Sequence, residues 1–127
     1  MVTKLTGRRV LVVEDEFFLA ADLEDTLTRA GADVVGPIPD LQAALAQVQM
    51  DAIDLAVLDV NLRGDEKAYP IADALSERGV PFLFASAYAP SDLPGRHRNV
   101  RYLEKPLNMA GVVKALGELA ELAERAG

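Results

Sequence analysis

The sequence predicts an α/β fold with a parallel sheet, because short β-branched apolar runs alternate with segments of helical period. The chain has 127 residues, of which 50% are apolar, and this is enough to build one hydrophobic core. We therefore expect residues 1–127 to form a single domain. Four apolar runs end in polar residues, as VLVVED, LAVLD, FLFAS and VRYLEKP, and parallel strands would bring these ends to one edge of the sheet.

Five strands are expected, each a run rich in β-branched, aromatic or other apolar residues. They cover approximately Arg9–Val13, Asp33–Gly36, Leu55–Asp59, Pro81–Ser86 and Val100–Glu104. The third run is apolar on both faces, which is typical of a central strand in a parallel sheet.

Two helices are expected before the central strand. The first covers Phe17–Ala30 and is stopped by Gly31, and its apolar residues recur at helical spacing: Phe17, Leu19, Ala20, Leu23 and Leu27. The second covers Leu41–Met50, and Asp40 is suited to cap its amino terminus.

Two more helices are expected after the central strand. The loop NLRGDEKAY leads to a helix that begins near Pro70, a favourable first helical residue, and ends before Gly79. The last helix begins near Asn108, and it is predicted to direct five apolar residues inward: Val112, Val113, Leu116, Leu119 and Leu122.

The segment Ala89–Asn99 interrupts the alternation of strands and helices. Pro94 and Gly95 would each weaken a helix interior, by about 3 and about 1 kcal/mol relative to alanine. We therefore expect a short helical turn or an irregular, mobile loop in place of a full fourth helix. His97 lies in this polar, basic stretch and is predicted to be a solvated loop residue.

Charge and composition limit the classes of function. A net charge of -7 and a pI near 4.6 disfavour direct binding of nucleic acid, which depends on lysine and arginine. The chain has no cysteine, so it has no disulfide and no thiolate metal site, which is compatible with a cytoplasmic location. The apolar stretch near the amino terminus is too short for a signal peptide or a membrane span.

The polar strand ends would share one crevice at the carboxyl edge of the sheet. They supply carboxylates at Glu14, Asp15 and Asp59, a hydroxyl at Ser86 and an ammonium at Lys105. This set suits divalent-metal binding and phosphoryl transfer. Taken singly, each residue also has a simpler explanation: acids near a helix amino terminus, a turn or capping residue, or a polar strand end.

In order, element and spacing, these residues resemble a response-regulator receiver domain over essentially the whole chain. The intervals from Asp15 to Asp59 and from Asp59 to Ser86 match that family, and the interval from Ser86 to Lys105 is slightly shorter. The shortening falls in the proline-containing segment without a helix signal. The resemblance implies a flavodoxin-like, doubly wound five-stranded parallel sheet in the order 2-1-3-4-5, with helices on both faces and a short or irregular fourth helix.

The resemblance also implies a role for each site residue. Asp59 would accept a phosphoryl group from a phosphohistidine on a histidine kinase or histidine phosphotransfer protein, so His97 need not take part. Mg²⁺ would be held by Glu14, Asp15, Asp59 and the backbone carbonyl of Asn61. Ser86, the N–H of Ala87, and Lys105 would contact phosphoryl oxygens, and Tyr102 would be the aromatic of the switch. Asn61 and Tyr88 would tune dephosphorylation.

The stretch Pro81–Tyr88 is also similar to that of stand-alone receivers with an altered fourth helix. Such a protein would signal by binding a downstream protein or pass phosphoryl groups on, and would turn over no separate substrate. Two other classes stay open: a receiver-like docking module that works without phosphorylation, and an aspartyl-nucleophile phosphatase. The phosphatase is disfavoured because enzymes of that class carry an Asp-x-Asp pair at the end of the first strand. Here the candidate nucleophile, Asp59, ends the third strand. A flavodoxin-like cofactor carrier is disfavoured because no strand end carries a glycine-rich phosphate loop.

Overall fold

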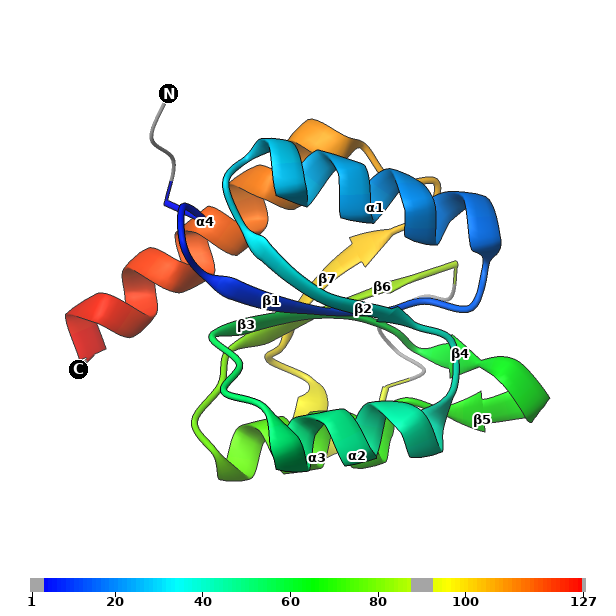
Figure 1. Ribbon diagram of the computed structural model, residues 1–127. Coiled ribbons are helices and arrows are strands. Elements are labelled where there is room, and N and C mark those ends of the chain that lie inside the picture. Colours follow the sequence, from blue (N-terminus) through cyan, green and yellow to red (C-terminus); the bar gives the residue numbers. More distant parts are fainter. Residues whose placement is uncertain (1–3, 88–92, 127) are drawn as a thin grey trace.

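The computed structural model describes residues 4–87 and 93–126 and contains a five-stranded parallel sheet. Its strands are β1 (Arg9–Val13), β2 (Asp33–Ile38), β3 (Leu55–Asp59), β6 (Phe82–Ser86) and β7 (Arg101–Glu104). They lie in the order β2-β1-β3-β6-β7, and every neighbouring pair is parallel (Figure 1). Because β6 and β7 are the fourth and fifth strands of this sheet, the expected order 2-1-3-4-5 and the flavodoxin-like architecture are confirmed.

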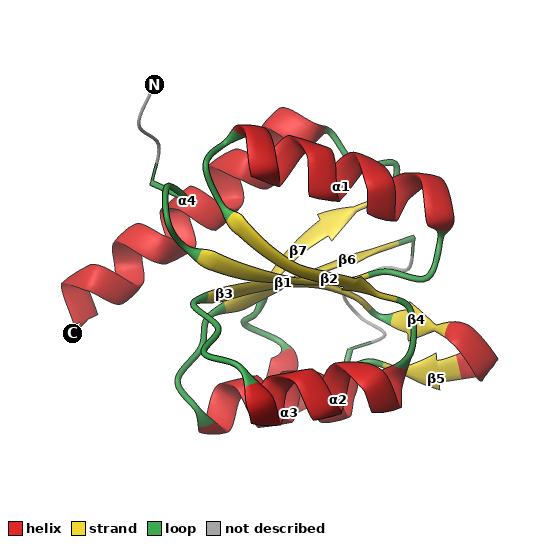
Figure 2. Ribbon diagram, in the orientation of Figure 1, coloured by secondary structure: helices red, strands yellow, loops and turns green. Residues whose placement is uncertain are grey.

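Helices cover both faces of the sheet. They are α1 (Phe17–Arg29), α2 (Leu41–Met50), α3 (Tyr69–Glu77) and α4 (Met109–Ala126). Figure 2 shows α1 and α4 on one face and α2 and α3 on the other. The β3 side chains are all buried, as the sequence predicts for a central strand.

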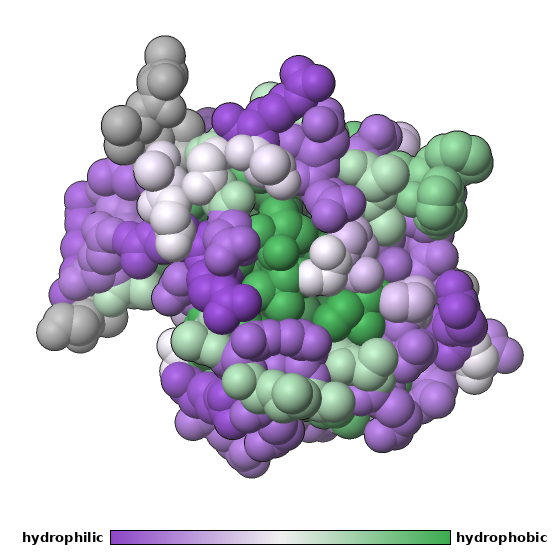
Figure 3. Space-filling view, viewed as in Figure 1, coloured by the Kyte–Doolittle hydropathy of each residue, from purple (hydrophilic) through white to green (hydrophobic). Residues whose placement is uncertain are grey.

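The core has two layers, one on each face of the sheet. Alternate residues of β1 contribute to opposite layers: Leu11 packs with the α2 and α3 side, and Val12 packs with the α1 and α4 side. In Figure 3, apolar side chains gather between the two helical layers, while polar side chains cover the helices. This packing holds the carboxyl ends of the strands at one edge.

The helix boundaries follow from local hydrogen bonds at the amino termini. The Asp40 carboxylate accepts a hydrogen bond of 2.8 Å from the N–H of Ala43, so the predicted cap of α2 is confirmed. Glu16 caps α1 by accepting from the N–H of Leu19 at 2.7 Å. The Asn108 amide oxygen accepts from the N–H of Gly111 at 3.1 Å, just before α4.

Strand β2 is longer than predicted, because it runs through Gly36 and Pro37 to Ile38. Its pairing with β1 shifts register between Leu11 and Val13, and Gly36 takes a positive φ of 101° there. A Cβ at this position would lie 2.8 Å from the carbonyl oxygen of Val12, so glycine is required. The predicted strand, Asp33–Gly36, therefore ends two residues too early.

The predicted loop after Asp59 contains a small antiparallel hairpin. It consists of β4 (Asn61–Leu62), a 3₁₀ turn over Arg63–Asp65 and β5 (Glu66–Lys67). The N–H of Ala68 donates to the carbonyl of Val60 at 2.9 Å and closes the base of the hairpin. Helix α3 then begins at Tyr69, one residue before the predicted start.

One predicted core residue, Leu122 on α4, is exposed instead. Leu122 is 60% exposed, although Val112 and Leu116 on the same helix are fully buried. Near its carboxyl end, α4 extends beyond the strands, so the apolar side of the helix no longer faces the sheet there (Figure 1). Phe17 shares the helical spacing of α1 but is 76% exposed, because it lies at the first position of the helix.

Among residues 93–100 the helical structure is limited to one short 3₁₀ turn, Gly95–His97. This confirms the expected irregular segment for the described part of Ala89–Asn99; positions 89–92 lie outside the described residues. The prediction that His97 is solvated is wrong, since its side chain is buried and 3% of the residue is exposed.

Aromatic rings and a carboxylate enclose His97. Its ring stacks on Tyr69 at 6.0 Å between centroids and meets Phe82 and Phe84 edge to face at 6.2 and 5.7 Å. Its Nε2 lies 3.0 Å from Oδ1 of Asp73 on α3. These partners come from α3 and β6, so no local sequence pattern around His97 could indicate its burial.

Arg96 reinforces this attachment by bonding the same carboxylate. Its Nε and Nη2 donate to Asp73 at 2.8 and 3.1 Å. The hydrogen bond from Arg96 is the main cause that lowers the pKa of Asp73. The turn before β7 is thereby fixed to α3.

We predict that His97→Ala destabilises the fold by about 2 kcal/mol, because it removes buried ring contacts and leaves a cavity among aromatic side chains. Urea unfolding followed by circular dichroism would measure this. The neighbouring exposed residue provides a matched control: Arg98→Ala should change the unfolding free energy by less than about 0.5 kcal/mol. Equal effects of the two substitutions would contradict a structural role for the His97 ring.

Candidate functional site at the carboxyl edge of the sheet

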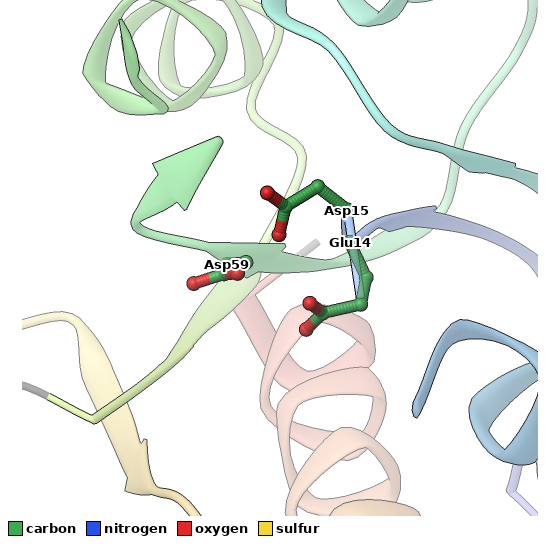
Figure 4. A group of neighbouring side chains, drawn as sticks. All are labelled: Glu14, Asp15 and Asp59. Carbon is green, nitrogen blue, oxygen red and sulfur yellow. The ribbon is translucent and has the colours of Figure 1, made fainter. Parts of the chain in front are cut away.

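Three carboxylates meet where β1 and β3 end. One oxygen each from Glu14, Asp15 and Asp59 lies within 4.8 Å of the others. Figure 4 shows them gathered at these strand ends. Glu14 and Asp59 are buried, whereas Asp15 is more open to solvent. Oxygen donors at this spacing fit a hard divalent cation such as Mg²⁺, which commonly takes one or two carboxylates.

Lys105 joins two of these acids. Its Nζ lies 2.9 Å from Oε1 of Glu14 and 3.2 Å from Oδ2 of Asp59. The lysine stands directly after β7, so its side chain crosses the edge of the sheet toward β1 and β3. Placing one ammonium between two buried carboxylates partly neutralises charges that would otherwise repel each other.

Backbone hydrogen bonds set the positions of the acids. The N–H of Glu14 donates to the carbonyl of Ile38 at 3.0 Å, so the unpredicted extension of β2 fixes the end of β1. The N–H of Asn61 donates to Oδ1 of Asp59 at 3.2 Å. Since Lys105 contacts Oδ2, both carboxylate oxygens of Asp59 have partners.

Ser86 lies at the end of β6 and is buried. Its carbonyl accepts from the N–H of Lys105 at 2.9 Å and from the hydroxyl of Tyr102 at 3.0 Å. Tyr102 is half-buried on β7, beside the core layer that contains Phe84. These bonds connect the end of β6 directly to β7 and to the lysine.

Burial dominates the electrostatics of Asp59. Desolvation, followed by the charge of Glu14, raises the pKa of Asp59 to about 7, although Lys105 lowers it. Burial also lowers the pKa of Lys105, but Glu14 and Asp59 more than offset this effect and raise it above its ordinary value. The pocket therefore favours added positive charge beside Asp59, which a divalent cation would provide.

The structure brings together most of the residues singled out in the sequence. Glu14, Asp15, Asp59 and Lys105 are in or near contact, and the N–H of Asn61 bonds Asp59. The Ser86 carbonyl accepts from both Tyr102 and Lys105. Ala87 follows β6 as an exposed bend residue. Tyr88 lies outside the described residues.

Two features near the site were not predicted. Lys67 lies opposite Asn61 in the β4–β5 hairpin and donates a hydrogen bond from Nζ to the amide oxygen of Asn61. A cavity of about 320 Å³ borders Glu14 and Asp15 and is lined by Phe17, Pro37 and Arg63 among others. The glycine in NLRGDEK was a possible turn signal for the hairpin, but two-residue strands leave almost no periodicity to detect.

Comparison with known proteins identifies the family. The family model described as the response regulator receiver domain matches residues 10–117. The chain belongs to this family. Receivers of this kind are signalling modules of two-component systems, and they typically bind Mg²⁺ through acidic residues. Within the described part of this receiver, no helix combines the length and apolar content needed to cross a bilayer.

One sequence relative and two solved structures illustrate the similarity. Transcriptional regulatory protein PdtaR of Mycobacterium tuberculosis H37Rv is 29% identical over 93% of this receiver, which spans 66% of the length of PdtaR. SdrG of Sphingomonas melonis Fr1 is 43% identical with a TM-score of 0.78, covering 93% of this chain and 98% of SdrG. SdrG of Pseudomonas melonis Fr1, in a BeF3-activated conformation, is 42% identical with a TM-score of 0.74, covering 94% and 99%.

The raised pKa of Asp59 predicts how stability depends on pH without Mg²⁺. Because the folded state holds this proton more tightly than the unfolded state, its contribution to stability is lost as pH rises from 3.8 toward about 7. Asp59→Asn should therefore stabilise the metal-free protein at pH 8 by about 1–2 kcal/mol, after allowance for solvent screening.

Urea unfolding in EDTA at pH 5 and pH 8 would test this prediction. The advantage of Asp59→Asn over the wild type should shrink at pH 5, and Asp25→Asn at an exposed ion pair should show no such pH-dependent difference. If wild type and Asp59→Asn lose stability in parallel between the two pH values, burial does not raise the pKa of Asp59 as described.

Proposed function

We propose that residues 1–127 act as one receiver domain that takes a phosphoryl group onto Asp59 and changes its protein contacts in response. One observation carries this proposal: the Asp59 carboxylate is buried at the sheet edge beside two acids and the Lys105 ammonium. A nucleophilic carboxylate with cation-binding acids on one side and a fixed cation on the other suits phosphoryl transfer.

Glu14, Asp15, Asp59 and the backbone carbonyl of Asn61 would hold Mg²⁺. When bound, the ion would neutralise charge on the transferred phosphoryl group. The fit rests on the oxygen donors gathered within 4.8 Å and on the burial of two of them.

In the proposed transfer, an Asp59 oxygen attacks the phosphorus of a partner's phosphohistidine. The new bond joins this oxygen to phosphorus, the phosphorus–nitrogen bond breaks, and its electron pair remains on the imidazole. Lys105, already 3.2 Å from Asp59, would pair with a phosphoryl oxygen. Ser86 and the N–H of Ala87 would donate to the others.

The conformational response would run through Ser86 and Tyr102. Both are tied to the site by the hydrogen bonds on the Ser86 carbonyl, so a shift of Ser86 toward a phosphoryl group would disturb Tyr102 and β7. SdrG, which is 42% identical to this chain, has a BeF3-activated conformation, and this supports an activated conformation for this receiver as well. Tyr88 and Asn61 would affect the rate of dephosphorylation.

The partners we propose are a histidine kinase or histidine phosphotransfer protein as donor and a downstream protein as target. The receiver would catalyse its own phosphorylation and dephosphorylation without turning over a separate substrate. Direct binding of nucleic acid is disfavoured by the net charge of -7. We propose a cytoplasmic location, with which the cysteine-free sequence is compatible.

Incubation with Mg²⁺ and acetyl phosphate should add a single phosphoryl group, visible in the intact mass. Asp59→Asn should abolish the adduct, because the nucleophile is gone, whereas Asp25→Asn on the surface of α1 should keep it. Asp15→Asn should weaken Mg²⁺ binding. An adduct that persists in Asp59→Asn would refute the assignment of the phosphoacceptor, and no adduct from acetyl phosphate or phosphohistidine donors would favour a docking module.

Lys105→Ala should keep Mg²⁺ binding but lose the coupling between phosphorylation and the environment of Tyr102, because no ammonium would pair with the phosphoryl oxygen. Ser86→Ala should impair the same coupling less, through one hydrogen bond worth about 1.5–3 kcal/mol to a charged group. NMR shifts of Tyr102 before and after phosphorylation would measure both effects. Wild-type shifts in the two variants would count against this switch.

A further inference from the structure

Lys67 lies across the β4–β5 hairpin from Asn61, which follows Asp59 by two residues. The two residues are paired in the antiparallel register, and Lys67 Nζ donates to Oδ1 of Asn61. The hairpin is closed at its base by the bond from Ala68 to Val60. The lysine is exposed, so the core does not depend on its side chain.

The position of Asn61 makes its side-chain oxygen relevant to the phosphoacceptor. Its own N–H donates to Oδ1 of Asp59 at 3.2 Å, so the amide side chain starts beside the carboxylate. An acceptor at that place can orient a water molecule for attack on a phosphoryl group. With Lys67 bonded to it, one of the two acceptor positions of this oxygen is already occupied, which leaves the oxygen less able to orient water.

We propose that Lys67 is a positioning residue that lengthens the lifetime of the phosphorylated state by keeping the Asn61 amide oxygen engaged. This inference rests on the proposed phosphorylation of Asp59. In the step that Lys67 slows, a water oxygen forms a bond to phosphorus and the bond from phosphorus to Asp59 breaks. The electron pair stays on the carboxylate, and both water protons leave with inorganic phosphate as H₂PO₄⁻.

The test compares the decay of the phosphorylated protein after the donor is removed, measured by intact mass. Lys67→Met keeps most of the stem and removes the donor, and it should shorten the half-life about three- to tenfold. Lys67→Arg should restore a half-life close to that of the wild type. Lys114→Met, at an exposed position of α4, is matched in charge and should leave the half-life unchanged.

Repeating the Lys67 substitution in a variant without the Asn61 side chain tests whether Lys67 acts through that side chain. In Asn61→Ala, which keeps the backbone carbonyl, adding Lys67→Met should no longer shorten the half-life, because the acceptor that Lys67 engages is absent. The rate of phosphoryl uptake and the melting temperature should stay as in the wild type for Lys67→Met, which separates this role from a structural one.

Three outcomes would overturn the inference: an unchanged half-life in Lys67→Met, a longer one, or an equal shortening with and without the Asn61 side chain. Failure of the wild type to form any adduct would instead remove the proposed function itself. The two failures are therefore distinguishable in one series of measurements.

Discussion

The bridge from Lys105 to Glu14 and Asp59 is the interaction on which the site depends. Two buried carboxylates beside a third acid repel each other and lose hydration, and the pKa of about 7 at Asp59 records that cost even with the lysine present. The backbone of the same lysine donates to Ser86. Lys105, which follows β7, thus contacts residues at the ends of β1, β3 and β6. A change of charge in the pocket would therefore act on the arrangement of these strand ends.

Most of the fold and the outline of the site could be predicted from sequence because the signals are local. Apolar runs, helix caps such as Asp40 and polar residues at strand ends all depend on neighbours in the chain. Parallel pairing then brings the strand ends together by geometry. What failed depends on distant partners: Leu122 is exposed because α4 extends past the sheet, and β2 continues through Pro37 because the paired strand β1 accommodates a register shift.

His97 is the clearest case of tertiary structure overriding composition. Its neighbours in sequence are polar and basic, which describes a solvated loop, yet the ring lies among Tyr69, Phe82 and Phe84. In the described part of the segment before β7, this side chain and the Arg96–Asp73 pair make the attachments to α3 that a regular helix would otherwise supply. The sequence indicated an irregular segment, but not the contacts by which Arg96 and His97 attach to α3.

The register shift in β2 also affects the outer edge of the sheet, which β2 forms. β2 is an outer strand, and outer strands offer unpaired backbone groups to which a strand of another molecule can add. Pro37 has no backbone N–H to offer, and the positive φ of Gly36 interrupts the regular extended backbone beside it. The irregularity that positions Glu14 therefore also opposes edge-to-edge aggregation of this acidic protein.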